Sequence, residues 1–252
     1  MMRMKAVVFA GLLAFGYAQA MEGEFDRSSE INQYITQLNS NATQEELIPT
    51  VRAIHISGIG DEQLAKAISD RLLRELPNLE TQFGAWTVRA LAATGEPLAK
   101  DTLEQVRKTT RVVRVRDECL EQIPQIDWYK QRNLVMASRR NYQEGDNMRV
   151  AQLLNLLQSD DYTFKKNGAY RMNWDKILDA RLMTEIAAQL QAFVDRGAAT
   201  KSADELLAMI DYTKLLGYSR DQQYRELLKR LSSSTQPKLK KTAVKALQTL
   251  NS

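Results

Sequence analysis

Apolar residues recur every three or four positions along most of the chain, and glycine, proline or short polar stretches separate the segments that show this spacing. This is the spacing of amphipathic helices. In residues 174–196 it places Leu178, Leu182, Ile186 and Leu190 on one face, which predicts a long helix. No stretch alternates apolar and polar residues convincingly over the length of a strand. We therefore predict about twelve helices in six hairpins.

Capping motifs predict where several of these helices begin. A serine or threonine followed three residues later by Glu or Gln satisfies two backbone donors at a helix start, and this pattern occurs at Thr43–Glu46, Ser202–Glu205 and Ser219–Gln222. Pro49 follows the first motif closely. Because proline removes a helical hydrogen bond and crowds the preceding turn, it predicts either a kink or a helix start at the proline itself.

Two segments of the chain are related as copies of one unit. Residues 51–58 read VRAIHISG, and 37 residues later residues 88–95 read VRALAATG. Leu64–Lys66 then matches Leu98–Lys100 after a turn that is three residues shorter. A unit of this length is one helical hairpin, which cannot bury its own apolar face and so implies a stack of similar units.

The repeated pattern, Val-Arg followed by a glycine stop and then by Gly-Asp or Glu-Pro and a Leu-Ala segment, resembles HEAT repeats. The resemblance implies an all-α fold, an α-solenoid of about six helical hairpins. It covers residues 44–108, whereas residues 126–158 and 202–250 share only the helical rhythm. Because such solenoids bind many unrelated partners, the resemblance indicates fold far better than function.

Residues 159–173 interrupt the rhythm. Asn167-Gly168 stands between two short stretches that contain aromatic residues, a pattern typical of a tight turn between strands. We predict an insertion loop over 159–173, with a short β-hairpin-like segment near 162–172. Two interpretations stay open, namely an ordered loop whose aromatics pack onto the solenoid and a projecting recognition loop.

The first twenty residues have the arrangement of a secretory signal peptide. Arg3 and Lys5 precede an apolar run, and Ala18-Gln-Ala20 is a small-residue cleavage motif. The run is shorter than the roughly 20 residues that a spanning helix needs. We predict cleavage after Ala20, a periplasmic or secreted protein, one helical-repeat domain over residues 21–252, and no transmembrane segment in it.

The net charge and the residue types present limit the classes of function that the protein can have. Removing the leader takes away two basic residues and no acid, which lowers the net charge from +4 to +2 and argues against nucleic acid as a partner. Cys119 is the only cysteine, and its apolar neighbours predict a buried thiol. His55 is the only histidine, so the usual zinc site cannot be assembled. We expect a protein that is not an enzyme and uses no cofactor or metal, with a carboxylate-based hydrolase as a lesser alternative.

Two groups of residues are candidates for partner binding. The first consists of aromatic and basic residues of the predicted insertion, namely Tyr162, Phe164, Lys165, Lys166, Tyr170 and Arg171. The second is a basic cluster at a junction between helices, namely Arg107, Lys108, Arg111 and Arg114. The leading hypothesis is an exported, non-catalytic scaffold or adaptor that binds another protein of the cell envelope along its concave face. The alternative is a binder of an anionic envelope polymer through the basic clusters.

A structure can separate these hypotheses. A groove lined with aromatic residues and arginine would favour the protein binder, because those side chains dominate binding energies at protein interfaces. A water-excluded acid pair in a deep pocket would favour an enzyme.

Overall fold

The computed structural model describes residues 23–251 of the chain. Over this range it contains thirteen α-helices and three short 3-10 helices. The strand-like pairing within the range is one isolated antiparallel bridge between Glu24 and Ser138. The predicted all-α fold is confirmed. The predicted signal peptide lies outside the described residues, so export and cleavage after Ala20 stay predictions.

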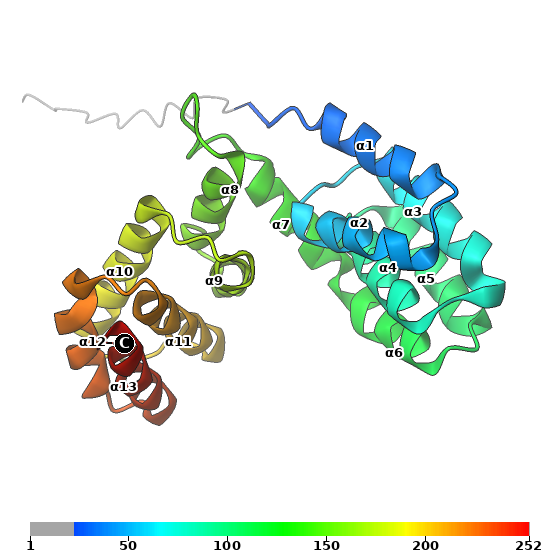
Figure 1. The fold of residues 1–252 in the computed structure, drawn as a ribbon. Helices are drawn as coiled ribbons and strands as arrows, with labels where there is room; N and C mark the ends of the chain where they lie inside the picture. The colour runs from blue at the N-terminus through cyan, green and yellow to red at the C-terminus, as the bar shows by residue number, and fades with distance from the viewer. Residues whose placement is uncertain (1–22, 252) are drawn as a thin grey trace, which may run out of the picture.

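The first six helices form three hairpins stacked side by side (Figure 1). Helices α1, α3 and α5 make one layer, and α2, α4 and α6 make the other. Their bounds are Ser28–Asn39 (α1), Gln44–Ser57 (α2), Glu62–Glu75 (α3), Thr81–Ala93 (α4), Pro97–Thr109 (α5) and Val113–Gln122 (α6). The 3-10 helices Leu76–Asn78 and Ile123–Gln125 follow α3 and α6.

The last six helices repeat this arrangement. Helices α8, α10 and α12 form one layer, and α9, α11 and α13 form the other. Their bounds are Met148–Leu157 (α8), Tyr162–Asp175 (α9), Ala180–Asp195 (α10), Ala203–Tyr218 (α11), Arg225–Ser232 (α12) and Pro237–Asn251 (α13), and the 3-10 helix Gln222–Tyr224 precedes α12. Helix α7 (Ile126–Ala137) lies between the two stacks (Figure 1). The described chain is therefore a solenoid of six hairpins with one linking helix.

Each stack has its own hydrophobic core. One core runs from Leu38 to Tyr129 and the other from Val150 to Leu250. A small third cluster of Met136, Leu156 and Phe164 joins α7, α8 and α9. No helix within residues 23–251 is long and apolar enough to cross a membrane.

The predicted repeat register agrees with the structure. Gly58 and Gly95, the matched glycines of the two copies, end α2 and α4 with φ of +75° and +72°. These two helices pack directly against each other. The capping box at Thr43–Glu46 begins α2, which continues through Pro49 without ending. Ser202 caps α11 as predicted, whereas Ser219 ends that helix instead of starting the next one.

The prediction of a β-hairpin-like insertion is wrong. Residues 162–175 form α9, which the Asp161 side chain caps by accepting a hydrogen bond from the Thr163 backbone nitrogen. Gly168 lies inside this helix, and a Cβ added there would come within 3.2 Å of Leu156 Cβ on α8. The glycine therefore permits close approach of two helices and does not make a turn.

The predicted helix over 174–196 is divided in two. Helix α9 ends at Asp175, where Lys176 adopts a left-handed conformation, and α10 begins at Ala180. Leu178, predicted to lie on the apolar face of that helix, lies in the connection and is 40% exposed. The buried face begins at Leu182 and continues through Ile186 and Leu190.

Candidate functional site

A cavity of about 500 Å³ lies between α9 of the second stack and α2, α4 and α7. Aromatic and basic side chains dominate its lining. They are His55, Trp86, Tyr129, Tyr170 and Trp174, together with Arg52, Arg89 and Arg171. We call this cavity the aromatic–arginine groove.

Helix α9 contributes two exposed aromatic side chains to the groove. Tyr170 and Trp174 are one helical turn apart, and their ring centroids lie 6.2 Å apart in a stacked arrangement. Tyr170 is 56% exposed and Trp174 is 60% exposed. Large aromatic rings that are exposed together leave apolar area in contact with water, which is a feature of interaction sites.

Trp86 on α4 lies between two arginines. The guanidinium carbon of Arg52 is 4.6 Å from the centroid of the Trp86 ring, and that of Arg89 is 4.9 Å away. Both distances are those of cation–π contacts. Arg89 also donates two hydrogen bonds to the Glu118 carboxylate, at 2.7 Å and 2.8 Å. Arg52 is exposed and makes no ion pair with any described residue.

His55 is half-buried in the groove and keeps its imidazole neutral. Burial, reinforced by the charges of Arg132 and Arg171, lowers the pKa of His55 to about 3. Its Nδ1 lies 3.3 Å from the backbone oxygen of Arg89. Because a carbonyl oxygen can only accept, Nδ1 carries the proton and Nε2 is left as an acceptor.

Two buried arginines lie beneath the groove and bind helix ends. Arg171 of α9 donates to the backbone oxygens of His55 and Ile56, in the last turn of α2. Arg132 of α7 donates to the backbone oxygen of His55 at 3.5 Å and to that of Ala93, at the end of α4, at 3.2 Å. The last carbonyls of a helix lack partners within it and carry partial negative charge. The guanidinium groups therefore satisfy these carbonyls.

Two further arginines complete the set at the end of α2. Arg149 of α8 donates to the Ile56 backbone oxygen at 2.9 Å and pairs with Asp175 at 2.8 Å. Arg27, just before α1, donates to the Ser57 backbone oxygen at 2.9 Å. Four segments outside α2 thus converge on its end. This convergence holds the second stack against the first and fixes the position of α9 relative to α2 and α4.

The structure separates the residues predicted in the first candidate group. Phe164 and Arg171, two of the candidates for partner binding, are buried. The Tyr162 hydroxyl donates to Glu205 at 2.6 Å, Lys165 donates to Gln189 at 3.0 Å, and Lys166 pairs with Asp204 at 2.8 Å, so these three face α10 and α11. Tyr170 and Arg171 are the members that line the groove.

The basic cluster lies at the end of α5 and the start of α6. Arg107 pairs with Glu104 at 2.8 Å. Lys108, Arg111 and Arg114 are exposed and make no ion pair within the described part of the chain. None of the four residues lines the groove.

The residues of the opposite wall were not predicted, although the sequence contains one signal for them. Arg52 and Arg89 occupy the same position in the two copies of the repeat, directly after Val51 and Val88. In the structure both side chains flank Trp86. A residue type retained in both copies on an exposed helix face could have indicated this wall.

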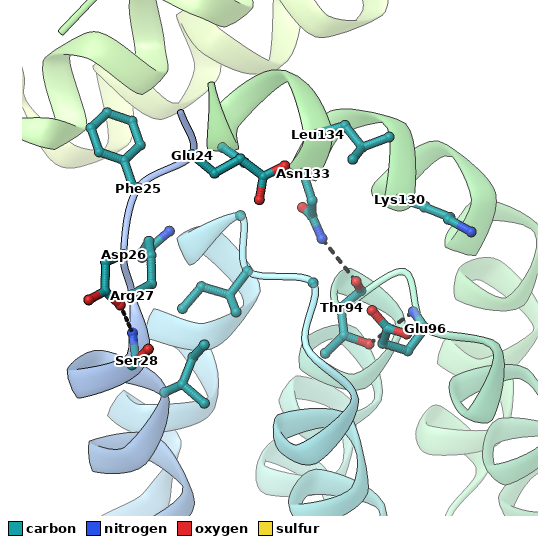
Figure 2. A pocket seen from close by; sticks show the side chains of 15 residues that line it. Glu24, Phe25, Asp26, Arg27, Ser28, Thr94, Glu96, Lys130, Asn133 and Leu134 are labelled. Carbon is teal, nitrogen blue, oxygen red and sulfur yellow. Dashed lines mark hydrogen bonds between the residues drawn. The ribbon is translucent and has the colours of Figure 1, made fainter. Parts of the chain in front are cut away.

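A second cavity, of about 350 Å³, lies beside the segment that precedes α1 (Figure 2). Its lining includes Glu24, Asp26 and Glu96, with Lys130 on the α7 side. Burial raises the pKa of the Glu96 carboxyl. We call it the acidic cavity, because its acids outnumber the one lysine and the paired Arg27. Among the described residues, no group of three or more His, Cys, Asp or Glu side chains could hold a metal ion.

The comparisons with known proteins are sparse. No protein-family model matches the sequence, and no curated protein matches it either. Among solved structures, the chain is similar to human deoxyhypusine hydroxylase in complex with glycerol, with 12% sequence identity and a TM-score of 0.36 over 88% of this chain and 84% of that chain. The similar structure is that of an enzyme, in contrast to our expectation of a protein that is not an enzyme. A likeness this low carries no activity over to the chain.

Proposed function

We propose that this chain binds another protein by accepting a short segment of it in the aromatic–arginine groove. The observation that carries the proposal is the stacked and exposed pair Tyr170 and Trp174, which shares one cavity with Trp86 and its two arginines. Tyr, Trp and Arg are the side chains that most often dominate the binding energy of protein interfaces.

The size of the groove suits a segment of chain better than a folded surface. Concave sites of roughly 300–1,000 Å³ enclose a small molecule or a few side chains. A volume of about 500 Å³ therefore suits a few neighbouring side chains. The stacked rings of α9 offer a flat apolar surface, and the arginines offer donors in fixed directions.

The groove is held in shape before any partner binds. Arg132 and Arg171 tie α7 and α9 to the end of α2, and Glu118 holds Arg89 in place. A binding site whose side chains are already ordered loses less conformational entropy when the partner arrives.

Two features of the sequence support a protein partner in the cell envelope. The HEAT-like character of the repeats supports a protein that binds along its concave face. The signal peptide predicted for residues 1–20 supports a partner in the cell envelope.

Site-specific crosslinking tests the proposal. A photoreactive amino acid at position 174 should crosslink one short segment of a partner protein in the native cells. The same amino acid at position 218 is the control, because Tyr218 on α11 is also exposed, at 47%, but lies outside the groove. Peptide mapping by mass spectrometry identifies the crosslinked segment.

Affinity measurements complete the test. Trp174→Ala should weaken binding of that segment by about tenfold or more, as expected for an aromatic anchor. The melting temperature of this variant should equal that of the wild type, because the Trp174 side chain is mostly exposed. Tyr218→Ala should bind as the wild type does. Equal crosslinking from both positions, or full affinity in Trp174→Ala, would refute the proposed function.

A further inference from the structure

We infer that the segment bound in the groove is acidic, and that it places a carboxylate against Arg52 while an adjacent apolar side chain packs on Tyr170 and Trp174. This inference rests on the proposed function and specifies the chemistry of its ligand. The carboxylate can come from an Asp or Glu side chain or from the C-terminus of the partner.

The first support is the balance of charge at the groove. Arg89 already pairs with Glu118, and Asp175, the acid that lines the groove, already pairs with Arg149 on α8. Arg52, Arg132 and Arg171 make no ion pair with any described residue. His55 contributes no charge near neutral pH. The groove therefore carries an excess of positive charge.

The second support is the burial of that charge. Arg132 and Arg171 are 0% and 3% exposed. Their partners are uncharged or carry only partial charge, because Arg132 donates to the Asn133 side-chain oxygen and both arginines donate to backbone carbonyls at the ends of α2 and α4. A helix end supplies only about half an elementary charge. Two helix ends cannot offset two full charges. Since water screens buried charges poorly, the excess acts on whatever enters the groove.

The third support is the geometry of Arg52. Its guanidinium group lies over the Trp86 ring, at 4.6 Å from the centroid. A stacked guanidinium keeps the N–H groups at its edge free, and these form two parallel hydrogen bonds with a carboxylate. The apolar rings of α9 in the same cavity supply the surface for a neighbouring side chain.

The acidic cavity allows a comparison with the groove within the same chain. It lies beside Gly58 and Gly60, and Glu24, Asp26 and Glu96 outnumber Lys130 in its lining (Figure 2). The two cavities therefore differ in the sign of their charge. An acidic segment is favoured by the groove and disfavoured by the acidic cavity.

Selection from random peptide libraries tests the inference with the whole chain. One library displays peptides with a blocked C-terminus, and a second leaves the C-terminus free. Selection on the wild-type protein should enrich Asp or Glu beside an aromatic or aliphatic residue in the blocked library if side chains supply the carboxylate. Enrichment confined to the free library would assign the carboxylate to a C-terminus. Either result supports the inference.

Charge substitution then locates the contact. For a selected peptide, Arg52→Gln should weaken binding about fivefold and reduce its dependence on salt. Lys130→Gln is the matched control, because it removes one exposed positive charge that lines the acidic cavity instead. It should leave the affinity unchanged. Of the three tryptophans in the chain, Trp86 and Trp174 line the groove, so intrinsic fluorescence reports binding directly.

The possible failures are distinguishable. Selected peptides that are neutral or basic, and that lose affinity in Trp174→Ala, would overturn the inference and leave the proposed function standing. If Trp174→Ala selects the same peptides as the wild type, the groove is not a peptide site. The inference and the proposed function then both fail. An equal loss of affinity in Arg52→Gln and Lys130→Gln would also overturn the inference.

Discussion

Substitution of Gly95 by alanine measures how closely α4 and α7 approach. Gly95 ends α4 with φ of +72°, a conformation that costs other residues roughly 1–2 kcal/mol. A Cβ at this position would lie 2.6 Å from both the backbone nitrogen and the Cα of Lys130 on α7. Backbone atoms cannot rotate away as a side chain can, so α7 would have to move, at a further cost of about 1–3 kcal/mol. We expect Gly95→Ala to lower the free energy of unfolding by about 3 kcal/mol.

Substitutions at two other glycines separate the cost of the positive φ from the cost of the steric clash in the free energy of unfolding. Gly145 has φ of +87° and a Cβ there would have no atom within 4 Å, so Gly145→Ala should cost only about 1 kcal/mol. Gly58→Ala should fall between the two, because its close neighbour is the flexible side chain of Met136. Urea unfolding followed by circular dichroism gives all three free energies. If Gly95→Ala costs no more than Gly145→Ala, α7 does not pack against α4 as the structure shows.

Two further predictions concern the core. Leu91→Asp should lower the free energy of unfolding by several kcal/mol, since Leu91 is fully buried in the first stack, whereas Lys241→Asp on the exposed face of α13 should change it by less than about 0.5 kcal/mol. Equally small effects in urea unfolding would contradict the packing. Cys119 is buried, and burial raises the pKa of its thiol to about 12, so a thiol reagent at pH 8 should react with it only after unfolding. A fast reaction of the folded protein would show that the α6 thiol is accessible.

The hairpins could be predicted because their signals are local. Apolar spacing marks the buried face of each helix, and a glycine with positive φ ends both α2 and α4. The offset of 37 residues between Gly58 and Gly95 therefore gave the correct register of two neighbouring helices. The buried state of Cys119 followed from the same spacing.

The error at residues 159–173 arose where a local signal competes with long-range packing. Asn167-Gly168 is a common turn sequence, but here the glycine lets α9 lie against Leu156 and Leu157 of α8. That contact depends on a helix whose placement is not apparent within the segment. The sequence pattern alone therefore favoured a turn at a position that packing makes helical.

The groove could not be assembled from sequence for a related reason. Arg171 contacts the backbone oxygen of Ile56, a residue 115 positions earlier, and Trp174 shares a cavity with Trp86. These residues come together because α7 lies between the two stacks and α9 packs against the end of α2. The local signals identified Tyr170 as an exposed aromatic candidate, but they gave no indication that Arg171 would be buried beneath it.

His55 makes the environment of the groove measurable by pH. In the folded chain burial and the neighbouring charges of Arg132 and Arg171 lower the pKa of its imidazole to about 3, while the unfolded chain retains a value near 6.5. As the pH falls below about 6.5, the unfolded state takes up a proton that the folded state does not. The stability contributed by neutral His55 is therefore complete above that pH and is lost as the pH falls towards 3, by up to about 1.4 kcal/mol per pH unit.

Between pH 5 and 6.5 the aromatic and arginine neighbours of His55 do not titrate, because Trp86 has no ionisable group, burial raises the pKa of Tyr129, and arginine keeps its proton at these pH values. The slope of unfolding free energy against pH in this window should be smaller in His55→Gln than in the wild type. Since His55 is the only histidine, its imidazole proton signal is identifiable by NMR without assignment. We expect that signal to stay constant from pH 8 to pH 5. A shift with a midpoint near 6.5 would mean that Arg132 and Arg171 do not enclose the imidazole, and it would contradict the arrangement that places α7 and α9 at the end of α2.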